Sequence, residues 1–368
     1  MNRPRLEHLA WSKAQRDRWP LSLAESAVAA PDFEALGLPH ALRFRPTGGD
    51  PLPELERALG ARLGAPGGRV LVTAGASEAN ACVLAALLDA GDEVLLELPG
   101  YEPHRAVPPY FGARVRTFAR RHERGYGALG EEVESALGGA TRLVMFTDLH
   151  NPSGTPLPVQ DAMALTSLAE RRGLWLVCDE TFRDASARAP GSWSTLSSRW
   201  ITTSTLTKVY GLGSLRIGWV SGSAEVLERC ANAQNALSVE PARPSAALAL
   251  ALVPHLDALR ERTRGILATN HARWGRAVAG GLACDASVPS QGTTTFVRFS
   301  GPRDGDAFAA HAAERFELLV APGRFFGDPC GVRVGLGGEP VRCAAAIDTF
   351  QRAVRDFNAV HAAAGGPA

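Results

Sequence analysis

The sequence predicts an α/β fold in which a mostly parallel sheet carries helices on both faces and is joined to a smaller α+β domain. Between residues 69 and 221, short apolar segments alternate with longer segments of helical periodicity, a pattern typical of parallel sheets. Beyond residue 290, short strand-like segments and a closing helix replace that alternation. The chain has 368 residues, 45% of them apolar, which is enough for two well-buried cores.

The composition argues against several classes of function. The 39 basic and 38 acidic residues give a net charge of +1, which disfavours nucleic acid or an anionic membrane as the main partner. No segment has the apolar length that spans a bilayer, and the first residues lack the apolar core of a signal peptide. Six cysteines occur singly, without metal-binding or disulfide spacing. We therefore expect a cytoplasmic protein with reduced cysteines and no metal.

The elements are expected in a simple order. Residues 5–19 should form a short helix and 20–40 an extended, proline-punctuated arm, followed by a helix near 53–64. The sheet is expected to contain strands at 70–73, 93–98, 114–118, 142–148, 175–179, 200–204 and 216–221, with helices at 77–89, 102–111, 129–137 and 158–172. A long helix at 244–279 should lead to strands near 294–299, 317–321 and 331–336 and to a closing helix at 340–360.

Lys208 is the most informative single residue. Of the 39 basic residues only Lys13 and Lys208 are lysines, in a chain that otherwise uses arginine. A desolvated lysine can lose its proton and attack a carbonyl to form a Schiff base, whereas a guanidinium stays charged. Lys208 follows an apolar, Thr/Ser-rich strand, and glycines follow it where the backbone approaches another group closely. We interpret it as a covalent anchor; the alternative is a surface lysine in an arginine-biased chain.

The spacing around Lys208 resembles the cofactor-lysine segment of the class I/II aminotransferases, the pyridoxal 5′-phosphate (PLP) enzymes typified by aspartate aminotransferase. That family has a hydroxyl residue three before the lysine, another one before it, and a phosphate-binding arginine eight after it. Thr205, Thr207 and Arg216 fit these positions. The glycine spacing does not suit a nucleotide-binding loop, because the lysine precedes Gly211 and Gly213.

The resemblance covers nearly the whole chain and implies an organisation. It implies the PLP-dependent transferase fold, with an N-terminal arm at 1–40 that packs with the small domain, a large PLP-binding domain at 41–250 and a small C-terminal domain at 251–368. It also implies a homodimer.

Further cofactor contacts implied by the resemblance lie where strands end. Gly75-Ala76-Ser77 joins a strand to a helix, where free backbone N–H groups suit a phosphate and Ser77 is expected to cap the helix. Tyr101 matches the aromatic residue that stacks on the pyridine ring, and Asn151 of Asn-Pro-Ser-Gly matches the asparagine that binds the ring 3-oxygen. Without the family these would be an ordinary turn, a core tyrosine and another turn.

Asp179 and Arg333 complete the predicted site. Asp179 ends a very apolar strand, where a carboxylate is costly unless a cation such as a protonated pyridine nitrogen pairs with it. Arg333 lies in Gly-Val-Arg-Val-Gly, which resembles the motif whose arginine clamps the substrate α-carboxylate. The resemblance implies that Asn151 also contributes to substrate binding.

Two positions depart from the family pattern. Phe182 stands where most members have a tyrosine that donates to the ring oxygen, and the loss of that donor should raise the pKa of the Lys208 Schiff base. Phe44 and Arg45 occupy the loop that usually supplies a tyrosine to the partner subunit's phosphate. Arg45 is the candidate to replace that tyrosine, because its charge could contact the phosphate.

We therefore expect a PLP-dependent aminotransferase that exchanges an amino group between an L-amino acid and a 2-oxo acid. The first alternative, kept open by Phe182, is a PLP-dependent lyase, cyclase or oxidase that acts on a specialised amino acid. A second alternative is a PLP-sensing module of a DNA-binding regulator, which is disfavoured because only about 40 residues precede the resemblance.

Overall fold

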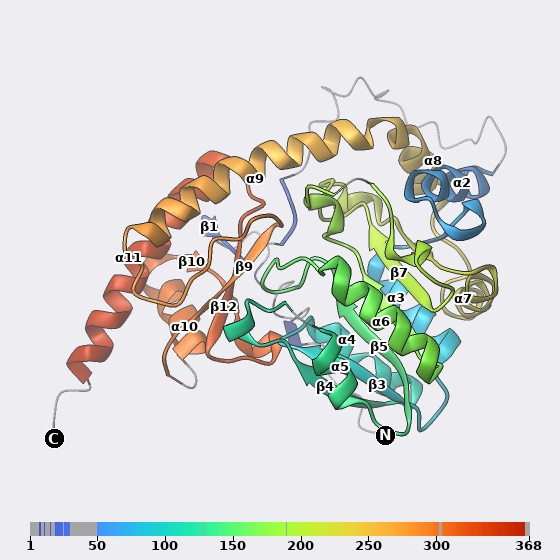
Figure 1. Cartoon of the computed structure of the whole chain (residues 1–368). Coiled ribbons are helices and arrows are strands. Elements are labelled where there is room, and N and C mark those ends of the chain that lie inside the picture. The colour runs from blue at the N-terminus through green and yellow to red at the C-terminus, as the bar shows by residue number, and fades with distance from the viewer. Residues whose placement is uncertain are drawn as a thin grey trace.

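The computed structural model describes residues 7–8, 11, 15, 19–24, 26–29, 50–127, 129–188, 190–301 and 304–364. Within these ranges the central sheet has the strand order β2-β8-β7-β6-β5-β3-β4 (Figure 1). Only β8 runs antiparallel to its neighbours, and the other pairs are parallel. The strands are β2 (Leu71–Thr73), β3 (Glu93–Leu98), β4 (Arg114–Ala119), β5 (Thr141–Thr147), β6 (Trp175–Asp179), β7 (Trp200–Thr205) and β8 (Gly218–Ser221).

Helices cover both faces of this sheet, as predicted. Along β3, Val94 and Leu96 face the core formed with α3 (Ala76–Leu87) and α7 (Ala224–Leu237), whereas Leu95 faces the opposite core. That second core is covered by α5 (Gly130–Ala136) and α6 (Val159–Arg172). Strands buried on both faces must be apolar at successive positions, which explains the continuous apolar runs in the sequence.

Prolines interrupt two helices that the sequence analysis treated as continuous. The expected helix at 102–111 is α4 (Glu102–Ala106) followed by a 3₁₀ turn (Pro108–Phe111). The expected helix at 244–279 is α8 (Arg243–Leu252) and α9 (Leu256–Ala279), separated by a 3₁₀ turn that contains Pro254. Proline lacks the backbone N–H and disfavours helical backbone in the residue before it, so both predictions of one helix were wrong.

The α9 helix runs from the large unit to the smaller one (Figure 1), and its residues belong to two cores. Leu256 and Leu259 at its start pack into the core that includes α2 (Pro51–Leu63) and α8, whereas Trp274 and Ala277 near its end belong to the core of the smaller unit. The division into residues 1–40, 41–250 and 251–368 stays a prediction. Its last boundary falls before α9, yet the first part of α9 packs into the core of the large unit.

The smaller unit combines short strands with helices. In it, β12 (Gly331–Gly335) pairs antiparallel with β9 (Thr294–Arg298) and with β11 (Ala321–Pro322). From the arm, β1 (Leu21–Ser22) pairs with β10 (Leu318–Leu319), and α10 (Asp304–Phe316) and α11 (Pro340–Ala364) pack on each other. Neither α7 nor α10 was among the predicted elements.

The expected helix at 5–19 lies largely outside the described residues, although Glu7, His8, Trp11 and Gln15 are helical where the structure describes them. Phe44 and Arg45 also lie outside the described residues. None of the described helices combines the length and the apolar character needed to cross a membrane.

Candidate active site

The candidate residues of the large sheet gather at the carboxyl ends of its parallel strands. Asp179 is the last residue of β6, Thr205 is the last residue of β7, and Lys208 follows three residues later. Tyr101 comes shortly after β3. Because neighbouring parallel strands end at the same edge, the topology brings these residues to one side of the sheet.

Asp179 is a buried carboxylate with three hydrogen-bond donors around it. Its Oδ2 atom accepts from Asn80 Nδ2 at 3.0 Å and lies 3.3 Å from His104 Nε2, and its Oδ1 atom accepts from the Thr181 backbone N–H at 3.0 Å. Burial is the largest influence on its pKa and raises it, but the hydrogen bond and charge of His104, with the other two donors, bring the pKa below the usual value. Asp179 therefore presents a negative charge at the base of the site.

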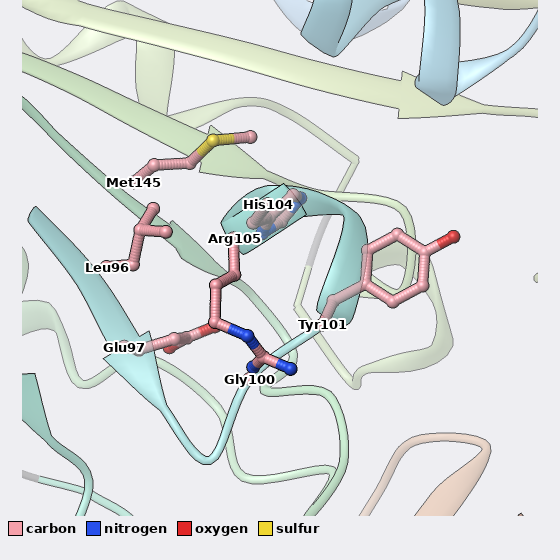
Figure 2. Close-up of a pocket in the computed structure, with 7 residues that line it drawn as sticks. All are labelled: Leu96, Glu97, Gly100, Tyr101, His104, Arg105 and Met145. Carbon is pink, nitrogen blue, oxygen red and sulfur yellow. The ribbon is translucent and has the colours of Figure 1, made fainter. Parts of the chain in front are cut away.

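His104 and Asn80 belong to the site, although the sequence analysis did not single them out. His104 lies one turn beyond Tyr101, and the two rings meet edge to face with centroids 5.3 Å apart (Figure 2). Asn80, one turn into α3, also accepts from Thr203 Oγ1 at 2.6 Å. The sequence contains a signal for both residues, because each is a polar residue on a buried helical face close to a predicted site residue.

A small cavity lined in part by Tyr101 is too narrow to be the ligand site. Figure 2 shows Leu96, Glu97, Gly100, His104, Arg105 and Met145 around it together with Tyr101. These side chains leave no room for a water molecule. Glu97 there is paired with Arg120 at 2.9 Å, and this buried ion pair supports β3 from below the site.

The turn between β2 and α3 forms a narrow cradle. Gly75 has φ +92°, and a Cβ atom there would lie 2.6 Å from Arg216 Nη2. A Cβ on Gly218 would lie 2.5 Å from the Gly75 carbonyl carbon. Arg216 itself is exposed and donates to the Ala74 carbonyl oxygen at 3.2 Å. The exposed guanidinium and the backbone N–H groups of the first helical turn are chemically suited to an anion.

Ser77 does not cap α3, contrary to expectation. The helix begins at Ala76, so Gly75 occupies the N-cap position and no side chain caps the helix. Ser77 lies exposed at the second helical position, on the side of the cradle. The helix starts one residue earlier than predicted because glycine adopts the positive φ angle that ends the preceding strand.

The threonines beside Lys208 are held by the β7–β8 connection. Thr205 Oγ1 donates to the Ile217 carbonyl oxygen at 2.7 Å and lies 2.9 Å from Thr207 Oγ1. The Lys208 carbonyl oxygen accepts from the Val28 backbone N–H at 3.0 Å, so the arm lies directly against the lysine. Thr207 and Lys208 are half-buried, which leaves their side chains accessible to a ligand.

Arg333 reaches the same region from the smaller unit. It is buried in β12 and donates to Asn151 Oδ1 at 3.1 Å and to the Ala24 carbonyl oxygen at 2.9 Å. Its guanidinium carbon lies 4.9 Å from the centroid of the Phe326 ring. The structure thus joins Arg333 to Asn151 of the large unit and to the arm.

Phe182 and His150 are buried among protein groups and have structural roles. Phe182 packs in an apolar cluster with Leu149 and Leu206, so this position places no hydroxyl in the site. His150 is fully buried between Ser153 Oγ at 2.7 Å and the Pro99 carbonyl oxygen at 2.8 Å, and burial holds its pKa well below the usual value. Its role is to fix the loop that carries Asn151.

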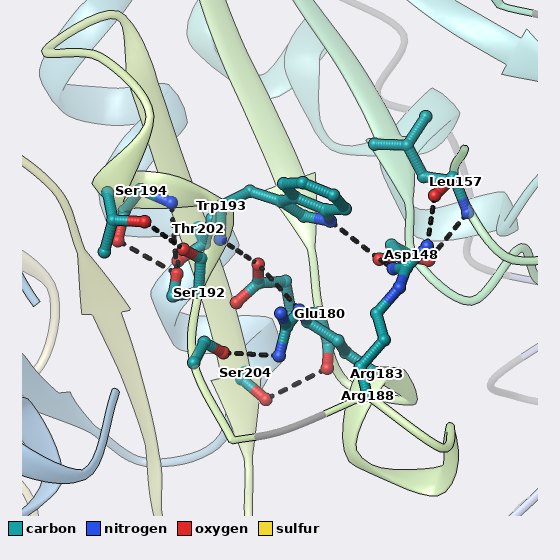
Figure 3. A network of polar contacts seen from close by, with 12 residues as sticks. Asp148, Leu157, Glu180, Arg183, Arg188, Ser192, Trp193, Ser194, Thr202 and Ser204 are labelled. Atoms are coloured by element: carbon teal, nitrogen blue, oxygen red, sulfur yellow. Dashed lines mark hydrogen bonds and ion pairs between the residues drawn. The ribbon is translucent and has the colours of Figure 1, made fainter. Parts of the chain in front are cut away.

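A polar network supports the strand ends (Figure 3). Asp148 accepts from Arg188 Nη1 and from Trp193 Nε1, each at 2.7 Å. Glu180, next to Asp179, accepts from the Trp193 backbone N–H at 2.7 Å, and burial raises the pKa of Glu180 to about 7. These contacts fix the loop after β6 without entering the site.

Comparisons with known proteins agree with this geometry. The family model described as aminotransferase class I and II matches residues 29–350. An arginine–pyruvate transaminase of Pseudomonas aeruginosa is 31% identical over 296 residues, which are 74% of this chain and 72% of that protein. The capreomycidine synthase of Streptomyces vinaceus is 31% identical over 304 residues, or 80% of this chain and 77% of that protein.

The fold has a close counterpart among solved structures. A PLP-dependent aminotransferase of Streptococcus suis superposes with a TM-score of 0.86 at 22% identity, covering 97% of this chain and 99% of that chain. At this identity the likeness concerns the fold, and it confirms the predicted PLP-dependent transferase fold.

Proposed function

Because this chain belongs to the class I and II aminotransferases, enzymes that depend on PLP, we propose that Lys208 holds the cofactor while Arg333 holds an L-amino acid or a 2-oxo acid. The observation that carries this assignment is the convergence of Asp179, Lys208 and Arg216 at one edge of the sheet, opposite Arg333.

The residues at the site fit PLP. The Gly75 cradle admits a phosphate because no Cβ atom fills it, and Arg216 supplies the positive charge that a phosphate dianion requires. Asp179 is ionised and suits a protonated pyridine nitrogen, and Tyr101 offers a flat face for the ring. When bound, PLP supplies an electron-withdrawing ring that stabilises negative charge on the substrate Cα.

The protein residues then have separate tasks. Arg333 and Asn151 would hold the α-carboxylate, which fixes the substrate Cα relative to Lys208. The Lys208 amine, once released from the cofactor, would take the proton from Cα, because a neutral lysine amine beside the substrate can act as a general base. Asp179 would keep the pyridine nitrogen protonated through the charge that its three hydrogen bonds maintain.

We propose L-arginine and pyruvate as the first substrate pair to test, because the Pseudomonas aeruginosa relative carries those names. The second candidate is cyclisation or elimination on a specialised amino acid. It is favoured by Phe182, which leaves the ring oxygen without the usual tyrosine, and by the similarity to capreomycidine synthase.

Product stoichiometry separates the two candidates. The purified holoenzyme is mixed with each amino acid of a panel, arginine included, without any oxo acid. An aminotransferase should release one oxo acid per active site and then stop until pyruvate is added. Continuous release of product or ammonia would favour the second candidate. Borohydride reduction should attach the cofactor covalently to the wild type and not to Lys208→Ala, and attachment at the same site in the variant would reject the role of Lys208.

We further propose that the enzyme is a cytoplasmic homodimer. Leu237 and Val239, at the end of α7, are 51% and 64% exposed, which suits a surface covered by a second copy. Sedimentation of the purified protein tests this, and a monomer across micromolar concentrations would contradict it.

A further inference from the structure

His8 lies in the arm, between the two units of the molecule. Its backbone N–H donates to Glu102 Oε2 at 2.5 Å, at the start of α4 and next to Tyr101. Its ring stacks on Phe325 of the smaller unit, with centroids 5.1 Å apart and 15° between the planes. The backbone of His8 is therefore held by the large unit and its imidazole by the small one.

The His8 ring carries an unused polar atom in a buried position. The residue is 5% exposed, and its Nδ1 atom has no hydrogen-bond partner within the described part of the chain. A buried imidazole nitrogen without a partner is unfavourable, because it has lost its hydrogen bond to water. Such an atom calls for an explanation, and a ligand bound nearby can supply the missing partner.

Two site residues act electrostatically on His8. Burial is the largest cause that lowers its pKa to about 3, followed by the positive charges of Arg333 and Lys208. The imidazole is thus neutral and has one N–H to donate. His8 and Arg333 contact the same Phe326 ring: its centroid lies 5.3 Å from that of His8 and 4.9 Å from the Arg333 guanidinium carbon.

We propose that His8 is a substrate-binding residue whose Nδ1–H donates to the α-carboxylate that Arg333 holds. The inference rests on the proposed function. A carboxylate has about four acceptor positions, and a guanidinium fork uses two of them. An anionic oxygen is stabilised beside the Arg333 guanidinium, whereas a cationic side-chain end would be repelled there. A neutral donor adds orientation without adding a further charge.

Acetate binding to the full-length holoenzyme tests this inference. Acetate carries the carboxylate without any side chain, and acetamide is its uncharged match. Binding is followed by the change in cofactor absorbance and by thermal unfolding, at constant ionic strength. Arg333→Leu establishes whether acetate occupies the carboxylate site.

Three variants isolate the hydrogen bond. His8→Phe keeps the stack on Phe325 and removes the donor, and His8→Asn returns an amide group near the Nδ1 position. Trp11→Phe is the matched control, because Trp11 contacts the same Phe325 ring with centroids 5.3 Å apart. We expect about tenfold weaker acetate binding in His8→Phe, partial recovery in His8→Asn and wild-type affinity in Trp11→Phe, as one hydrogen bond to a charged group predicts.

Each other outcome is informative. Equal acetate affinity in His8→Phe and the wild type would overturn the role of His8 and leave the proposed function intact. Equal weakening of acetate and acetamide would also overturn it, because it would show a packing role. If the wild type and Arg333→Leu bind acetate alike, the carboxylate site itself is rejected, and the proposed role of Arg333 fails together with the inference.

Discussion

Glu180 shows how one buried residue couples the stability of the fold to pH. Its pKa is raised from 4.5 to about 7, chiefly by burial, while the charge of Arg183 and the Trp193 N–H act in the opposite direction. The folded protein therefore keeps the proton on Glu180 over a range in which the unfolded chain has lost it.

This shift predicts a pH-dependent contribution to stability. The contribution of Glu180 is full below pH 4.5, falls as the pH rises toward 7, and is absent above that, because only the folded state binds the proton in this window. We expect the free energy of unfolding of the wild type, relative to Glu180→Gln, to fall by roughly 3 kcal/mol between pH 4.5 and 7.5. Urea denaturation of both proteins at several pH values measures this difference. A difference in the free energy of unfolding that stays constant with pH would contradict the prediction.

At the scale of residues, the sequence predicts candidate site residues that follow a strand or helix with a clear pattern. The buried position of Asp179 at the end of β6 was predictable because the carboxylate ends a continuous apolar strand, whereas the role of Lys208 stays a prediction that rests on the rarity of lysine in the chain. The buried position of His8 was not predictable, since it depends on contact with Phe325, more than 300 residues away. Likewise, nothing local to Ala24 indicates that its carbonyl oxygen meets Arg333.

At the scale of elements, the β2–α3 turn is the feature that a substitution tests best. Gly75→Ala would force a Cβ against Arg216 and would also strain a backbone with φ +92°. Gly91 is a matched control, with φ +95° and no atom within 4 Å of an added Cβ. Both changes should lower stability by about 1–2 kcal/mol, as positive φ costs a residue other than glycine.

Only Gly75→Ala should weaken the binding of PLP, because only there does the added methyl group fill the phosphate cradle. Titration of the apoprotein with PLP, followed by absorbance, measures both variants, and we expect a loss of at least tenfold for Gly75→Ala. Equal affinities in Gly75→Ala and Gly91→Ala would exclude the turn as the phosphate site.

The elements themselves were predictable where periodicity was strong. Strands β3 and β6 were predicted with their observed ends because both faces of each are buried and the runs are continuous. The α7 helix was missed although its signals were present, including Ser223 as an N-cap that accepts from the Val226 N–H at 3.4 Å. The break at Pro254 was missed because α8 and α9 share one apolar periodicity on either side of it.

At the scale of the whole molecule, the arm connects parts that the chain places far apart. Val28 donates to the Lys208 carbonyl oxygen, the Gly335 N–H donates to the Leu23 carbonyl oxygen at 2.6 Å, and Leu23 donates to Leu319 at 2.8 Å. One extended segment thus contacts the lysine loop and two strands of the smaller unit.

These contacts predict that the arm responds to a ligand together with the site. Saturating acetate should slow amide hydrogen exchange at Leu23, Val28 and Gly335 together, because a ligand that binds only the assembled state stabilises all its parts. Hydrogen-exchange mass spectrometry of the holoenzyme resolves these segments, with Arg333→Leu as the control. Slower exchange confined to β12 would show that the arm is independent of the ligand.

The reversal of direction between β7 and β8 has a consequence for how such an enzyme diversifies. Lys208 and Arg216 lie on one connection within the large sheet, whereas Arg333 and the contacts of the arm lie on other elements. Substitutions in the arm and the smaller unit can therefore alter the proposed substrate contacts without touching the connection that carries the proposed cofactor anchor. The two tasks are divided between parts of the molecule that can change independently.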